Sequence, residues 1–207
     1  MRLIERPPGW FRLLFPGAVF RMPPEKDNRP AVYLTFDDGP IPEVTPWVLD
    51  CLDHCGVKAT FFMVGQNVER NPQLLQEVKE RGHQVGNHTL HHIRGLGIPA
   101  SDYMADAKAG EKLTGSRLFR PPHGWLSGGQ LKIVRKDYKV IMYDLVTRDY
   151  SRRVSAEGVF DNVKKYARPG SIIVFHDSLK SYAKLKEALP RCIEWLKKEG
   201  YTFRVLQ

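Results

Sequence analysis

Three histidines lie within five positions of the segment GNHTLHH, which spans residues 86–92. His88 and His92 are four residues apart, so a helical turn would bring both imidazole rings to one face. Neutral imidazole is a common ligand of zinc and related transition metals. A polar surface turn with coincidental histidines is the alternative, because short motifs often match by chance. The segment alone leaves both interpretations open.

Two adjacent carboxylates, Asp37 and Asp38, lie in the motif TFDDGP. Asp and Gly-Pro are common in turns, so the motif in isolation fits a simple turn. At the end of a strand, however, neighbouring side chains can point in different directions, and one carboxylate can bind metal while the other accepts a proton. Asp38, His88 and His92 would then supply three protein ligands and leave a position open for water, as in catalytic zinc sites.

Alternating strand and helix patterns position these residues. Short β-branched and aromatic runs predict strands at 31–36, 58–64, 83–89, 116–120, 139–146, 171–177 and 201–206. Apolar periodicity and capping residues predict helices at 45–56, 71–82, 101–115, 127–138, 155–170 and 183–199. We expect the last helix to be broken at Pro190. This alternation indicates an α/β fold with a mostly parallel sheet.

Unusual polar residues follow the ends of the predicted strands. They are Asp37, Asp38, His88, His92, Arg120, Asp149 and His176. Barrel enzymes collect their chemistry at the carboxyl ends of their strands, whereas an open doubly wound sheet uses one crevice. Contributions from so many strands therefore predict a closed or nearly closed barrel of about seven strands.

Five motifs in order resemble those of polysaccharide deacetylases, the NodB-like group called carbohydrate esterase family 4. They are TFDDGP, H-T-x-x-H at 88–92, RPPHG at 120–124, Asp149-Tyr150, and VFHD around His176. The resemblance spans residues 31–206. It implies a distorted (β/α) barrel and one divalent metal ion, with zinc expected and cobalt or nickel as alternatives. It also implies removal of acetyl groups from an N-acetylated, or sometimes O-acetylated, carbohydrate.

The resemblance also implies roles for individual residues. Asp37 would be the general base, oriented by Arg120, and His176 the general acid, supported by Asp149. The implied metal ligands are Asp38, His88 and His92, and the implied substrate-binding residues are Pro122, His123, Gly124 and Tyr150. A backbone N–H near His123 would bind the oxyanion, and His91 would be only a neighbour of the ligands.

Two positions depart from the family pattern. His123 stands where the family usually has tyrosine or phenylalanine, and Tyr150 stands where tryptophan is common. We therefore expect a titratable group beside the site and an altered acyl pocket. Two other functions fit the motifs: an amidohydrolase acting on a non-glycan amide or cyclic imide, and a catalytically idle carbohydrate-binding relative. The complete set of acid, base and ligands counts against the idle form.

Composition limits the remaining possibilities. The 207 residues carry a formal net charge of +9, but the basic residues are dispersed in pairs, which favours a solvated surface over a nucleic-acid site. Three cysteines form no disulfide framework. No apolar run is long enough for a transmembrane helix. The sequence does not predict the substrate's identity, the native metal or the oligomeric state.

The N-terminal region is rich in aromatic residues. We expect residues 1–30 to form an extension that packs on a deacetylase domain at 31–207, with residues 10–20 covering a hydrophobic surface. Contact of residues 10–20 with a membrane surface is the alternative. Because no signal peptide is recognisable, we expect a cytoplasmic location, with association with the cell envelope as the alternative.

Overall fold

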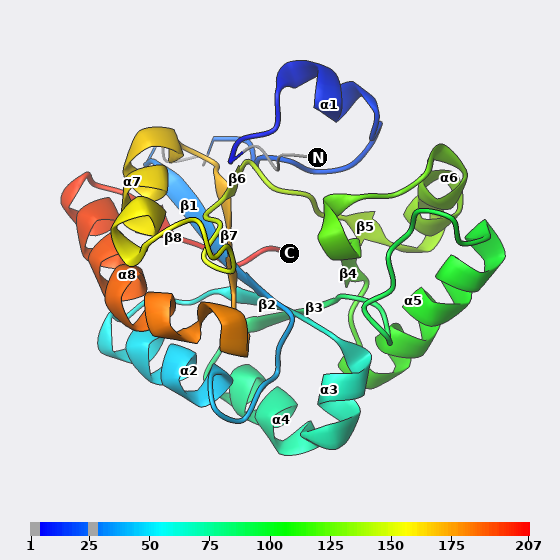
Figure 1. Ribbon diagram of the computed structural model, residues 1–207, viewed down its shortest axis with the longest axis horizontal. Helices are drawn as coiled ribbons and strands as arrows, with labels where there is room; N and C mark the ends of the chain where they lie inside the picture. The colour runs from blue at the N-terminus through cyan, green and yellow to red at the C-terminus, as the bar shows by residue number, and fades with distance from the viewer. Residues whose placement is uncertain (1–4, 25–28) are drawn as a thin grey trace.

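A curled parallel sheet forms the centre of the protein (Figure 1). The computed structural model describes residues 5–24 and 29–207. Its strands are β1 (Ala31–Asp37), β2 (Thr60–Met63), β3 (Gln84–Asn87), β4 (Leu118–Phe119), β5 (Lys139–Val140), β6 (Leu145–Val146), β7 (Ile172–His176) and β8 (Thr202–Phe203). They follow the order β5-β4-β3-β2-β1-β7-β6 in the sheet, and β8 pairs with the start of β1. Helices cover the outside of the curl. The predicted α/β fold, a distorted (β/α) barrel, is confirmed.

Eight α-helices lie in the described residues. They are α1 (Gly9–Leu13), α2 (Thr45–His54), α3 (Gly65–Arg70), α4 (Pro72–Glu80), α5 (Ala100–Thr114), α6 (Gly128–Asp137), α7 (Ala156–Tyr166) and α8 (Leu179–Lys198). Periodicity predicts six of them, whereas α1 and α3 were not predicted. The expected break at Pro190 is wrong, because α8 continues through it. Residues on both sides of Pro190, including Leu185 and Ile193, are fully buried. This packing offsets the backbone hydrogen bond that a proline cannot donate.

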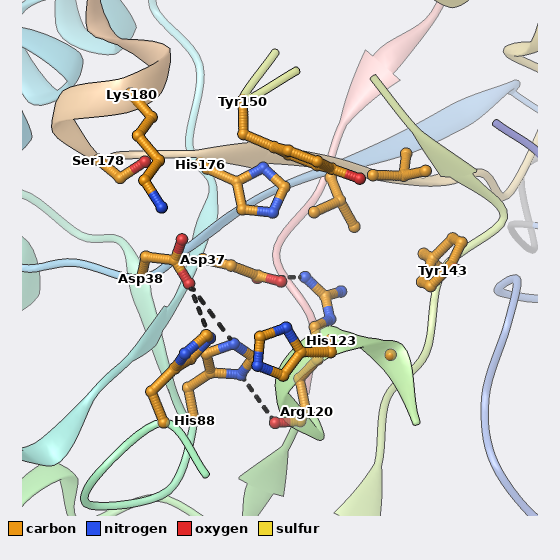
Figure 2. Close-up of a pocket in the computed structure, with 14 residues that line it drawn as sticks. Asp37, Asp38, His88, Arg120, His123, Tyr143, Tyr150, His176, Ser178 and Lys180 are labelled. Carbon is orange, nitrogen blue, oxygen red and sulfur yellow. Dashed lines mark hydrogen bonds and ion pairs between the residues drawn. The ribbon is translucent and has the colours of Figure 1, made fainter. Parts of the chain in front are cut away.

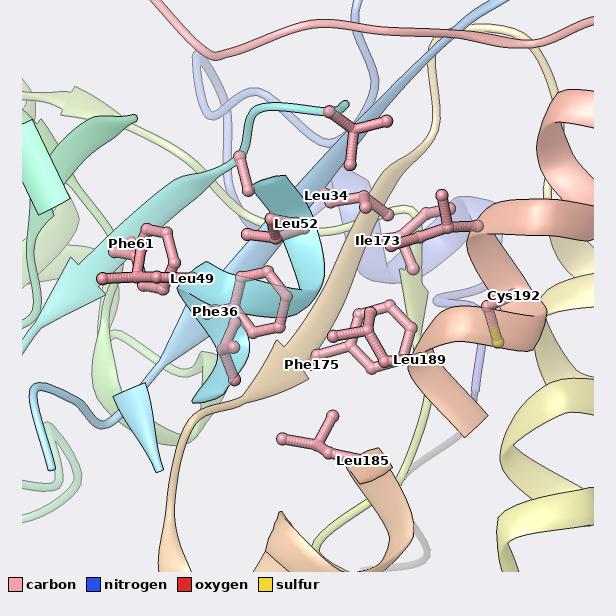
Figure 3. Close-up of a cluster of buried hydrophobic side chains, with 14 of the residues drawn as sticks. Leu34, Phe36, Leu49, Leu52, Phe61, Ile173, Phe175, Leu185, Leu189 and Cys192 are labelled. Atoms are coloured by element: carbon pink, nitrogen blue, oxygen red, sulfur yellow. The ribbon is translucent and has the colours of Figure 1, made fainter. Parts of the chain in front are cut away.

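The two-residue period of β1 separates its core face from its functional face. Thr35 and Asp37 both accept hydrogen bonds from Arg120 inside the barrel, and Figure 2 shows Asp37 beside Arg120. Leu34 and Phe36 point outward, into the main hydrophobic cluster beneath the helices (Figure 3). The Phe36 ring stacks between two aromatic rings of neighbouring strands, with centroid distances of 5.0 and 5.8 Å. The dense outer packing thereby fixes the direction of the interior side chains.

The prediction of one strand over residues 139–146 is wrong. This segment forms β5 and β6, which lie at opposite edges of the sheet. Between them, Ile141 pairs with Val19, and the fully buried Asp144 accepts hydrogen bonds from Arg12 and Arg168. A continuous apolar run fits one buried strand or two short ones equally well, so periodicity could not separate them.

The described part of the N-terminal region spans the gap between the two edge strands. Val19 bonds to the chain beside β5, and the carbonyl of Glu5 accepts a hydrogen bond from Val146 in β6. Three phenylalanines, Phe11, Phe15 and Phe20, are buried with residues of α5 and α6. The boundary of the extension at residue 31 stays a prediction, and its residues 1–4 and 25–28 lie outside the described residues.

The structure also describes the cysteines and the helices that were considered as possible membrane spans. All three cysteines are free. Within the described ranges, the helices are too short or too polar to cross a membrane.

The buried carboxylate of Asp144 leads to a prediction about stability. Burial raises its pKa, but hydrogen bonds from Arg168, Ser171 and Arg12 outweigh burial and lower the pKa to about 2. A carboxylate whose pKa is lower in the folded chain than in the unfolded chain stabilises the fold at neutral pH. That stabilisation is lost as the pH falls from about 4 towards about 2.

We expect Asp144→Asn to lower the free energy of unfolding by roughly 2–3 kcal/mol at neutral pH, and by less as the solution is acidified. Urea denaturation over a range of pH measures both effects. Asp161→Asn, which changes an exposed carboxylate, is the matched control and should have little effect. A loss for Asp144→Asn that does not change with pH would contradict the assigned ion pairing.

Candidate active site

The twin carboxylates diverge because the backbone turns sharply between them. Asp37 is the last residue of β1, and Asp38 adopts a left-handed conformation with a φ of 82°. Such a conformation is strained for a residue other than glycine and often marks a functional site. The turn leaves Asp37 inside the barrel beside Arg120 and directs Asp38 toward the histidines (Figure 2).

Asp38, His88 and His92 form a cluster that could hold a metal ion. One potential ligand atom from each lies within 4.8 Å of the others. Asp38 Oδ1 is 3.2 Å from His92 Nε2 and 3.8 Å from His88 Nε2. Burial works against charge on Asp38, but the hydrogen bond from His92 and the nearby histidines outweigh it, so the pKa of Asp38 lies below its usual range.

His88 is held in the form that a ligand requires. Its Nδ1 lies 2.8 Å from the backbone carbonyl of Arg120, which can only accept a hydrogen bond. Nδ1 therefore carries the proton, and the lone pair of Nε2 is left facing Asp38. Burial also lowers the pKa of His88 to about 4, which keeps the ring neutral at neutral pH. A carboxylate and two neutral imidazoles are a donor set suited to zinc.

The two histidines meet in a loop and not in a helical turn, although their spacing would also fit such a turn. Residues 88–92 follow β3 without forming a helix, and Thr89 and His92 have φ values of 66° and 53°. The rings of His88 and His92 still come within 5.1 Å of each other, between centroids. His91 lies outside the cluster and pairs with Asp106 at 2.5 Å.

Arg120 holds Asp37 in a fixed position. Its guanidinium is almost fully buried, and Nη1 donates to Asp37 Oδ1 at 2.6 Å and to the Thr35 hydroxyl at 2.8 Å. The other two nitrogens donate to the backbone carbonyls of Ile141 and Met142. Because every nitrogen is engaged, the guanidinium cannot swing away. Its charge and this short hydrogen bond hold the Asp37 carboxylate in place.

His176 and Asp149 form a second charged pair beside the first. Asp37 and His176 are partners in the register of β1 and β7, so their side chains leave adjacent strands at the same level. The fully buried Asp149 receives a hydrogen bond from His176 Nδ1 at 2.8 Å and another from the His176 backbone N–H at 2.7 Å. Burial lowers the pKa of His176, but Asp149 outweighs burial and raises it to about 9.

The turn at Pro122–Gly124 presents one available backbone donor. Proline has no N–H, and the N–H of Gly124 bonds to the carbonyl of Pro121. The N–H of His123 finds no acceptor within the described residues. The exposed His123 ring lies 4.7 Å from the ring of His92. Burial and the neighbouring His92 lower the pKa of His123.

These groups surround one cavity of about 220 Å³. The predicted site residues that line it are Asp37, Asp38, His88, His92, Arg120, His123, Gly124, Tyr150 and His176. Asp149 lies behind His176, and Pro122 is buried in the turn, so neither reaches the cavity. The sequence analysis missed Tyr143, Val146, Val174, Ser178 and Lys180. Nothing in their type or spacing distinguishes them from core or surface residues.

Asp177 is a further residue that the sequence analysis missed, although it completes the VFHD motif. It is fully buried, and its carboxylate accepts hydrogen bonds from the Gly39 N–H at 3.1 Å and the Thr45 hydroxyl at 2.6 Å. Gly39 directly follows Asp38. Asp177 therefore anchors the loop that carries a potential metal ligand. A Cβ atom at Gly39 would lie 2.0 Å from Asp177 Oδ2, so only glycine fits there.

If the cluster of Asp38, His88 and His92 binds zinc, we expect Gly39→Ala to weaken that binding by about 10–100-fold, because the new methyl group must displace either Asp177 or the Asp38 loop. Competition with a chromophoric zinc chelator measures the affinity. Gly128→Ala is the matched control, since a Cβ there meets no atom within 4 Å. Equal zinc affinity in wild type and Gly39→Ala would show that this anchor does not position Asp38.

The fold and the site together define a class of protein. It is an α/β barrel whose cavity joins a three-ligand cluster to a carboxylate–arginine pair and a histidine–carboxylate pair. The sequence pattern of the polysaccharide deacetylase family matches residues 25–139, and the chain belongs to this family. Similar proteins of this family are named deacetylases, which hydrolyse carbon–nitrogen bonds other than peptide bonds.

Similar proteins include a peptidoglycan-N-acetylglucosamine deacetylase of Bacillus cereus, 34% identical over 185 residues that make up 86% of each chain. The crystal structure of the Bc1960 peptidoglycan N-acetylglucosamine deacetylase matches with a TM-score of 0.84 and 32% identity, covering 95% of this chain and 93% of that one. BA3943 of Bacillus anthracis, described as a CE4 family pseudoenzyme, matches with a TM-score of 0.81 and 26% identity, covering 95% and 69%. The fold alone therefore does not establish catalysis, which depends on the side chains that line the cavity.

Proposed function

We propose that the chain removes the acetyl group from N-acetylglucosamine residues of peptidoglycan and that it uses one divalent metal ion, zinc. The observation that carries the proposal is the convergence of two charged pairs on one cavity. Asp37 is paired with Arg120, and His176 is paired with Asp149, beside the ligand cluster. The similarity to the peptidoglycan deacetylase of Bacillus cereus supports the choice of substrate.

Asp38, His88 and His92 would hold the ion, because the orientation of His88 and the proximity of the three donors fit zinc. When bound, the ion would act as a Lewis acid and would make hydroxide available near neutral pH.

The remaining residues transfer protons or stabilise the negative charge that develops during the reaction. Asp37, held in place by Arg120, accepts a proton from the water that attacks the acetyl carbonyl. The His123 N–H donates a hydrogen bond to the carbonyl oxygen as negative charge develops there. An amine leaves poorly unless it is protonated, so His176 donates a proton to the sugar nitrogen.

Asp149 supports His176 in this role. It fixes Nδ1 as the bonded nitrogen, which leaves Nε2 for the substrate, and it stabilises the charged imidazolium. The raised pKa of His176, at about 9, favours the protonated form that a general acid needs. A cation held by Asp38, His88 and His92 would lower the pKa of His176 from this value toward neutral pH.

The alternative of an idle carbohydrate-binding relative is disfavoured by the side chains. The chain has all four residues of the two charged pairs. Asp37 is hydrogen-bonded to Arg120, and Asp149 is hydrogen-bonded to His176. A chain without catalytic activity has no need for this arrangement of buried charges, which costs desolvation energy. The location of the protein in the cell stays a prediction.

Acetate release is the direct test of the proposal. Chito-oligosaccharides and peptidoglycan fragments are incubated with the protein and added zinc, cobalt or nickel, and mass spectrometry locates each lost acetyl group. We expect loss from N-acetylglucosamine. Loss only from N-acetylmuramic acid or from O-acetyl groups would change the assigned substrate. Hydrolysis of a simple amide or cyclic imide, without loss from any glycan, would support the non-glycan alternative instead.

A further inference from the structure

The short helix α1 exposes an apolar face. Trp10, Leu13 and Leu14 are 62%, 81% and 50% exposed. Their i, i+3, i+4 spacing places them on one side of the helical turn. On another side, Phe11 and Phe15 are buried in the protein and hold the helix in place. Of the five large hydrophobic side chains exposed in the described residues, three lie here, so the exposure is not scattered.

A basic cavity of about 340 Å³ adjoins this face. It is lined by Arg6, Pro7, Pro8, Gly9, Arg12 and Arg168. Asp144, fully buried beneath it, bonds to Arg12 and to Arg168 at 2.6 Å each. This carboxylate fixes two guanidinium groups but balances only one of their charges.

Arg6 adds a third positive charge to the cavity. Its side chain has no hydrogen-bonding or ionic partner in the described part of the chain. The adjacent Glu5 carboxylate is 2.7 Å from Arg148, with which it forms an ion pair. The cavity therefore combines excess positive charge with arginines that are held in place, which suits the binding of phosphate groups.

This surface lies away from the catalytic cavity. Asp144 precedes β6 and Arg168 precedes β7, so the arginines gather near the amino ends of these parallel strands. The catalytic side chains follow the carboxyl ends of the strands. In Figure 1, α1 stands at the upper edge of the molecule, outside the helices that surround the sheet. Contact through α1 would therefore leave the catalytic cavity open.

We propose that this surface docks on an anionic phospholipid bilayer. Trp10, Leu13 and Leu14 enter the boundary between headgroups and acyl chains, where amphipathic and aromatic side chains are favourable. Arg6 and its neighbours contact the lipid phosphates. A negatively charged surface also attracts the net charge of +9.

Charge favours a membrane over a second copy of the chain as the occupant. Two copies that met through this surface would bring their unbalanced arginines together. Three apolar side chains on one short helix also form a small patch compared with a stable dimer interface.

Vesicle co-sedimentation tests the proposal. The full chain should bind vesicles that contain phosphatidylcholine and phosphatidylglycerol, and it should bind vesicles of phosphatidylcholine alone much less. Leu13→Ser should weaken binding by at least about tenfold, because it removes buried apolar area. Arg6→Ala should weaken it by about fivefold. The fluorescence of tryptophan should shift to the blue on binding, and Trp10→Leu should remove most of the shift.

Two exposed residues on other elements provide matched controls. Leu96→Ser changes a leucine that is 61% exposed, and Arg70→Ala changes an exposed arginine at the end of α3, on the opposite side of Figure 1 from α1. Both variants should bind vesicles like wild type, and thermal unfolding should show that every variant is folded. Equal binding to neutral and anionic vesicles, or wild-type binding by Leu13→Ser, would overturn the proposal. The proposal would also be overturned if the chain formed a dimer without lipid, if Leu13→Ser dissociated that dimer, and if no binding to vesicles were found.

Discussion

Asp37→Asn should remove most of the hydrolysis while the bound metal is retained. Asparagine has the shape of aspartate but cannot accept the proton from the attacking water. Arg120 would keep its bonds to Thr35 and to two backbone carbonyls, so the local geometry should persist. General base catalysis contributes about 10²–10⁴-fold, and we expect a loss of that size in kcat. Acetate release measures the loss, and elemental analysis measures the metal.

Asp38→Asn is the matched comparison, because it makes the same chemical change one residue later. It should weaken metal binding itself, since it removes a charged ligand from the cluster with His88 and His92. Added zinc should then restore part of the activity of Asp38→Asn and none of the activity of Asp37→Asn. If both variants lose metal to the same extent, the assigned division of work between the two carboxylates is wrong.

His176→Ala should lower turnover on an amide by about 10²–10⁴-fold, because it removes the imidazole that donates a proton to the leaving nitrogen. The loss should be smaller on an activated acetyl ester, whose leaving group departs without a proton. Metal content should stay the same, since His176 is not part of the ligand cluster. The ratio of amide to ester rates, measured in wild type and variant, separates the two roles. Equal losses on both substrates would indicate that His176 only supports the site.

Much of the site could be predicted from sequence because parallel strands bring distant motifs together. Asp37 and His176 are 139 positions apart in the chain, yet they are register partners on adjacent strands. The motifs at the ends of β1, β3, β4 and β7 meet for the same reason. Recognising the strand ends was therefore sufficient to predict which side chains converge.

The loop conformations could not be predicted in this way. His88 and His92 approach each other through a loop with two left-handed residues, a conformation that their four-residue spacing does not indicate. Asp177 resembles any acidic residue after a strand until its bonds to Gly39 and Thr45 are visible. Such contacts depend on tertiary packing, and local sequence patterns do not report them.

Two of the departures from the predicted elements involve long-range contacts. Residues 139–146 divide into two strands, and between them Asp144 bonds to Arg12 and Arg168. Helix α8 passes through Pro190, and residues on both sides of the proline are buried. In each case a long-range contact outweighs a local preference. Proline and apolar periodicity report only the local preference.

Reconstitution with metal tests the central claim most directly. The protein is stripped with a chelator, zinc is added back in steps, and acetate release from a chito-oligosaccharide is followed together with bound zinc. The stripped wild type should be inactive and should regain activity as a single site fills. The double variant His88→Ala/His92→Ala should neither bind zinc nor regain activity. Full activity in the stripped wild type, or full zinc retention by the double variant, would contradict the account.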